Sequence, residues 1–152
     1  MKFYVKTILS CFIALDSVIE QIENVIKKKA RNSFYEYQGA ERLANEVLSL
    51  CDIRLDLIDL KEKTANSLNK LSEEDKILIA YKYFGIMPES ENFDHTSRNY
   101  FRKQIKAIER FSKILENEGM TYEHFLKTYM KIHYISATYN KMVKEDGKKH
   151  TI

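Results

Sequence analysis

The chain has 152 residues, 44% of them hydrophobic and 31% charged, and 25 basic residues nearly balance 22 acidic ones to leave a net charge of +3. This length and composition are typical of one ordinary folded domain and exclude a disordered or collagen-like chain. Four glycines, one proline and no tryptophan offer little turn chemistry for a sheet. We therefore predict an all-α protein, with residues 1–152 forming a single helical domain.

Two long helices are predicted in the first part of the chain. Apolar residues recur in steps of four and three over residues 8–26, which predicts a helix over residues 3–29. Similar spacing over residues 43–60 predicts a second helix at residues 40–69. A short connector should fold the two into a long antiparallel hairpin, which occupies residues 1–70. The apolar stripe is wide enough to recruit further helices or a second copy of the chain, so a homodimer stays open.

Two shorter helices with clear start signals should follow the hairpin, in a segment that ends at residue 119. Ser72 is followed by three acidic residues, a pattern typical of an N-cap and first turn, and Gly85 is a C-terminal stop. Thr96 or Ser97 can cap the next helix, which should extend to about Gly119.

A last helix is predicted from Thr121 to about residue 144, within a C-terminal segment over residues 120–145. It carries a mostly aromatic stripe of Phe125, Tyr129, Ile132, Tyr139 and Met142. We interpret this stripe as core or as a groove for a partner, in preference to a platform on which nucleobases stack.

Basic residues concentrate in the helix predicted at residues 96–119. Between Ser97 and Lys113 six basic residues stand against one acid, Glu109. One i, i+4 row contains Arg98, Arg102, Lys106 and Arg110, and a second, apolar row contains Phe101, Ile105, Ile108, Phe111 and Leu115. A helix that is basic outside and apolar inside suits a polyanion.

The segment around this helix resembles a known class of regulator. The letters ILIAYKYFG at residues 77–85, and SRNYFR at residues 97–102 followed by Lys106, Ala107 and Phe111, are similar to the helix-turn-helix end of phage late-gene transcriptional regulators of the ArpU and RinA type. Those regulators are in turn similar to region 4 of bacterial sigma factors. The resemblance implies a helix-turn-helix-like part over residues 71–119, with its first helix at residues 86–96.

The resemblance also implies roles for individual side chains. At the N-terminal end of a recognition helix, Ser97, Arg98 and Asn99 would reach base edges. Phosphate contacts would come from the basic residues farther along, which are Arg102, Lys103, Lys106, Arg110 and Lys113. DNA is then the expected partner, and the sigma-like kinship adds RNA polymerase.

The sequence contains none of the usual catalytic or metal-binding motifs. Its four histidines are scattered, and there is no H-E-x-x-H pair, Gly-rich phosphate loop or nucleophile elbow. We predict no enzyme, no cofactor and no metal. Cys11 and Cys51 lie among apolar neighbours and are expected to be free thiols in a reducing cytoplasm. No segment approaches the ~20 apolar residues of a membrane span, so we expect a cytoplasmic protein.

Two other interpretations of the basic helix stay open. Its charged face could simply keep a bundle soluble. Alternatively the chain is a non-enzymatic interaction module, a phage or accessory protein that binds or inhibits a host protein complex with its hairpin or C-terminal helix. A formed helix between Met87 and His95 would favour DNA binding, and an extended loop there would favour the interaction module.

Overall fold

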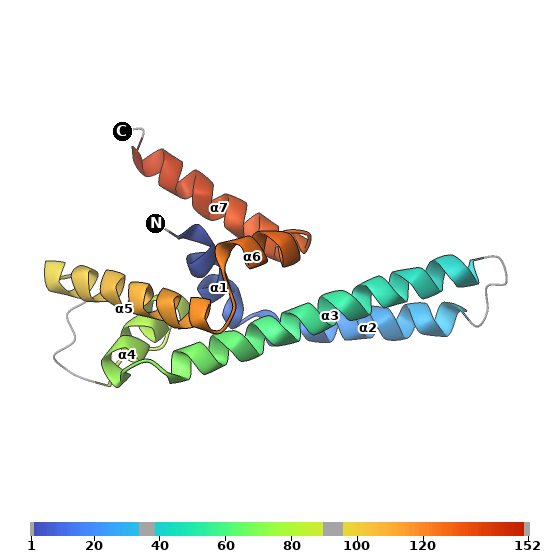
Figure 1. The fold of residues 1–152 in the computed structure, drawn as a ribbon, viewed down its shortest axis with the longest axis horizontal. Helices are drawn as coiled ribbons and strands as arrows, with labels where there is room; N and C mark the ends of the chain where they lie inside the picture. Colours follow the sequence, from blue (N-terminus) through green and yellow to red (C-terminus); the bar gives the residue numbers. More distant parts are fainter. Residues whose placement is uncertain (1, 34–38, 90–95, 151–152) are drawn as a thin grey trace. The chain divides into compact units, whose positions relative to one another are not determined.

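A computed structural model describes residues 2–33, 39–89 and 96–150. These residues form helices and no strands, which confirms the predicted all-α class (Figure 1). The helices are α1 (Phe3–Phe12), α2 (Leu15–Ser33), α3 (Ala40–Asn69), α4 (Glu73–Phe84), α5 (Arg98–Asn117), α6 (Tyr122–Thr128) and α7 (His133–His150). The chain divides into two compact units, one over residues 14–62 and one over residues 1–13 with 63–152.

The unit over residues 14–62 is an antiparallel hairpin made by α2 and most of α3 (Figure 1). Ion pairs join the two helices, among them Asp16 with Lys61, Glu23 with Arg54 at 2.8 Å, and Lys29 with Glu46 at 2.7 Å. Partners that come later on α2 come earlier on α3, as antiparallel pairing requires. The bounds of α3 agree with the predicted helix over residues 40–69.

The prediction of one first helix over residues 3–29 is wrong. α1 ends at Phe12, and α2 begins at Leu15 after a turn at Ile13 and Ala14. α1 belongs to the other unit, where it packs against α7 and α4. Because neither glycine nor proline marks the turn, the continuous apolar spacing conceals it.

Three helices of the larger unit begin where the local signals predict. The Oγ atom of Ser72 accepts a hydrogen bond from the backbone N–H of Asp75 at 3.2 Å. Gly85 ends α4 with a left-handed backbone, φ 67°, a conformation that glycine adopts without steric cost. Ser97 and Thr121 cap α5 and α6 in the same way as Ser72 caps α4. These caps confirm the predicted starts of the three helices.

The predicted last helix is also divided. α6 ends at Thr128, and α7 begins at His133 and extends beyond residue 144 to His150. Phe125 and Tyr129 are fully buried, and the ring centroid of Phe125 lies 5.7 Å from that of Tyr4 on α1. Burial confirms that this part of the aromatic stripe is core.

Candidate nucleic-acid interface

The side of α5 that faces the core differs from the predicted one. Its buried residues are Tyr100, Gln104, Ala107, Phe111, Ser112 and Leu115. Phe101 and Ile105 were expected among the core-facing residues, yet their side chains are 52% and 50% exposed. The apolar row is therefore turned partly toward solvent, and that part of the prediction is wrong.

The buried side of α5 includes a small residue and a polar residue that has a hydrogen-bond partner, and these explain its orientation. Gln104 is 4% exposed, and its Nε2 donates a hydrogen bond to the Tyr100 hydroxyl at 3.0 Å. Such a bond offsets the cost of burying a polar side chain. Ala107 is fully buried and occupies little space at the packed surface. Apolar residues alone therefore do not define the buried face of α5.

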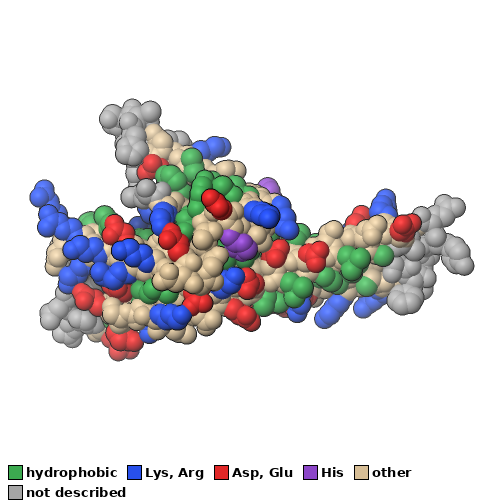
Figure 2. Space-filling model, in the orientation of Figure 1, with side chains coloured by type: hydrophobic (Ala, Val, Ile, Leu, Met, Phe, Trp, Pro, Cys, Tyr) green, Lys and Arg blue, Asp and Glu red, His purple; other side chains and the backbone are tan. Residues whose placement is uncertain are grey.

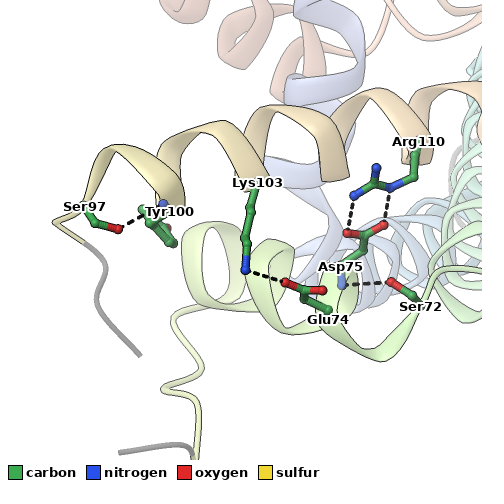
Figure 3. A network of polar contacts seen from close by, with 7 residues as sticks. All are labelled: Ser72, Glu74, Asp75, Ser97, Tyr100, Lys103 and Arg110. Carbon is green, nitrogen blue, oxygen red and sulfur yellow. Dashed lines mark hydrogen bonds and ion pairs between the residues drawn. The ribbon is translucent and has the colours of Figure 1, made fainter. Parts of the chain in front are cut away.

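Two of the predicted phosphate-binding cations are bound to α4 (Figure 3). The Arg110 guanidinium donates two hydrogen bonds to the Asp75 carboxylate, Nε to Oδ2 at 2.6 Å and Nη2 to Oδ1 at 2.8 Å. The Lys103 ammonium lies 3.0 Å from Oε1 of Glu74. Figure 3 shows both basic side chains directed from α5 toward α4. They tie two helices of the same unit together, so we assign them a structural role.

Asp75 is the most buried member of this network, with a side chain that is 4% exposed. The hydrogen bond from Arg110 holds the pKa of Asp75 below its ordinary value of 3.8, against the opposing effect of burial. The carboxylate therefore stays ionised at neutral pH and keeps Arg110 in place.

The remaining predicted site residues differ in their surroundings. The Oγ atom of Ser97 accepts the backbone N–H of Tyr100 at 3.1 Å, so this side chain is part of the N-cap. Arg98 and Asn99 are exposed in the first turn of α5. Asn99 and Ser97 also line a hollow of about 720 Å³ beside α4.

Four exposed cations, here called the basic row, lie on the solvent side of α5. They are Arg98, Arg102, Lys106 and Lys113. None of the four makes an ion pair with any residue in the described ranges. Spacings of four, four and seven residues place them on one side of a helix with 3.6 residues per turn, and Glu109 is the acid among them. Figure 2 shows Lys and Arg side chains gathered over α5.

The segment before α5 bears on the helix-turn-helix prediction. Residues 85–89 follow α4 and are not helical. Residues 90–95 lie outside the described part of the chain. The predicted first helix over residues 86–96 is therefore absent at residues 86–89 and at residue 96, and stays a prediction for residues 90–95.

Other kinds of site have less support. Among the described residues, no three His, Cys, Asp or Glu side chains are grouped so that they could hold a metal ion. A search of the same residues finds no helix with the length and apolar character needed to cross a membrane. Cys11 and Cys51 are free thiols, the first buried and the second half-buried.

The fold and the basic row define an all-α protein with a cationic helix surface. Comparisons with protein-family models, curated proteins and solved structures found no match to this chain. Its function is therefore inferred from the residues of α5 and the hairpin.

Proposed function

We propose that this protein binds nucleic acid, DNA in the first place, through the basic row of α5. The observation that carries the proposal is that these four cations are exposed and unpaired among the described residues, whereas Lys103 and Arg110 on the same helix are bound to α4. A phosphate backbone supplies regularly placed negative charge, and binding it releases condensed counterions.

Phosphate contact is the main mode in this proposal. Arg98, Arg102, Lys106 and Lys113 would neutralise phosphates, which gives affinity without sequence preference. Asn99 is exposed at the N-terminal end of α5 and could add a base contact there. Ser97 is no longer proposed to contact bases, because its side chain caps the helix.

A phage-type late transcription regulator is the narrower form of the proposal. It is supported by the resemblance of residues 77–85 and 97–111 to such regulators. RNA polymerase would then be the protein partner and the cytoplasm the place of action. This form needs a first helix before α5, so it is weakened by the non-helical backbone of residues 86–89.

Charge reversal tests the proposal. The double variant Arg102→Glu with Lys106→Glu should lower affinity for mixed-sequence duplex DNA by about tenfold or more at low salt, measured by fluorescence anisotropy. The control variant Lys27→Glu with Lys28→Glu changes the net charge equally at two exposed positions of α2 and should bind like the wild type. Circular dichroism checks that both fold. Equal affinity of the two variants would contradict the proposal.

A second candidate is a protein-interaction module, favoured by the surface of the hairpin. Leu48 and Leu55 of α3 are 63% and 58% exposed, and half-buried Cys51 lies between them in steps of three and four. This spacing is that of a helix-packing seam, so a second copy of the chain or a host protein could cover it. Sedimentation of the wild type and of Leu48→Gln with Leu55→Gln tests the homodimer, which only the wild type should form.

A further inference from the structure

We propose that the nucleic acid is single-stranded where it meets the start of α5, and that an unpaired base stacks on Phe101. This inference rests on the proposed function, because it adds a base contact to the phosphate contacts of the basic row. Its starting point is that Phe101, a large apolar ring, is 52% exposed between two members of that row, Arg98 and Arg102.

The ring of Phe101 contacts one buried aromatic neighbour. Its centroid lies 5.2 Å from that of Tyr100, with an angle of 69° between the ring planes. Tyr100 is 7% exposed and meets Tyr81 of α4 edge-on, with ring centroids 5.9 Å apart. Such edge-to-face contacts are favourable, so the exposed ring is held in place before any ligand binds.

An open hollow of about 520 Å³ lies beside this ring. Its lining includes Tyr81, Lys82, Met87, Tyr100, Phe101 and Gln104. A volume of this order is in the range of ligand pockets. Three aromatic rings suit a flat nucleobase, and the positive charge of Lys82 suits the phosphate of the same nucleotide.

The position of Phe101 relative to the cations favours an unpaired strand. Residues 98, 101, 102 and 105 are neighbours on one side of a helix, so a strand whose phosphates contact Arg98 and Arg102 passes directly over Phe101. In a duplex the base faces are stacked on one another, and only their edges are reachable. An unpaired base offers its face to an aromatic side chain.

A protein partner fits this patch less well. Its exposed apolar side chains are Phe101, Ile105 and, in the hollow, Met87, and they are bordered by the charged side chains of Arg98 and Arg102. Protein interfaces place larger apolar areas at their centre and exclude charge from it. One exposed ring is sufficient for one base.

Tryptophan fluorescence gives the direct test, because the chain contains no tryptophan. Phe101→Trp introduces a single reporter, and a short mixed-sequence single-stranded oligonucleotide should quench its emission as it binds. Val143→Trp is the control, at an exposed apolar position of α7 outside the basic row and the hollow, and should be quenched far less. Phe101→Ala should weaken single-strand binding about fivefold or more and leave duplex binding unchanged.

The outcomes separate the two proposals. Quenching at position 101 together with a selective loss of single-strand affinity in Phe101→Ala supports the stacked base. Single-strand binding without quenching, or equal losses for single strands and duplex, overturns the stacked base and leaves the phosphate contacts standing. If the protein binds neither single strands nor duplex, the stacked base and the phosphate contacts are both overturned.

Discussion

Arg110 and Asp75 stand 35 positions apart in the chain and share two hydrogen bonds, of 2.6 and 2.8 Å. Asp75 lies in the first turn of α4, where its backbone N–H is held by Ser72 and the positive end of the helix dipole favours its charge. The same residue therefore helps begin one helix and fixes the orientation of the next. This orientation leaves the basic row in solvent.

Loss of the Asp75 carboxylate should destabilise the protein more than loss of its neighbour. Asp75→Asn leaves Arg110 without its charged partner, whereas Glu74→Gln removes an ion pair whose acid is 65% exposed, and exposed pairs contribute little. Thermal unfolding at pH 7 should show a clearly lower Tm for Asp75→Asn and nearly the wild-type Tm for Glu74→Gln. Equal shifts in Tm would show that the buried pair stabilises the protein no more than the exposed pair does.

The contribution of Asp75 should depend on pH in a defined direction. Arg110 lowers the pKa of Asp75 in the folded protein below 3.8, so the unfolded state binds protons more readily. The stabilisation is complete well above the unfolded pKa and is lost as pH falls through the folded pKa. The difference in unfolding free energy between the wild type and Asp75→Asn should therefore shrink below about pH 4. A difference that stays constant down to pH 2 would contradict this.

Two phenylalanines of α5 should respond to truncation by very different amounts. Phe111 is fully buried, so Phe111→Ala should lower the unfolding free energy by about 3–5 kcal/mol. Phe101 is half-exposed, and Phe101→Ala should change it by only about 0.5–1 kcal/mol. Chemical denaturation measures both. Similar losses would restore the orientation predicted from the apolar row, in which both rings face the core.

The two thiols should differ in reactivity. Cys11 is fully buried, and burial raises the pKa of its thiol, which lowers the fraction of reactive thiolate. Cys51 is half-buried on α3. A thiol reagent should modify one cysteine quickly in the folded protein and both in denaturant, and Cys51→Ser should lack the fast reaction. Two equally fast thiols would contradict the packing of α1.

Several starts and stops of helices were predictable because their signals are local. Ser72, Ser97 and Thr121 each accept a backbone N–H three residues later, and Gly85 needs only its own left-handed backbone. Such features depend on neighbours in the sequence. The breaks after α1 and α6 lack these signals, and α1 packs against α7 and α4, which lie far from it in the sequence.

The candidate site was only partly predictable, because tertiary contacts determine which cations of α5 pair with acids and which stay available to a ligand. The sequence identified the cations of α5 but not that Arg110 and Lys103 meet acids of α4. It placed Phe101 inside because apolar residues usually mark the buried face, yet Gln104 is buried there with its own hydrogen-bond partner. Exposed Phe101 beside cations is the signal that only the packed structure reveals.

Salt dependence of binding tests the central claim most directly. If the basic row contacts four phosphates, log Kobs for duplex DNA should fall with log salt with a slope of about −3.6, measured by fluorescence anisotropy. For Arg102→Glu with Lys106→Glu the slope should be shallower by about 1.8, because two contacts are lost. Identical slopes for the two proteins, or a wild-type slope near zero, would contradict binding through the basic row.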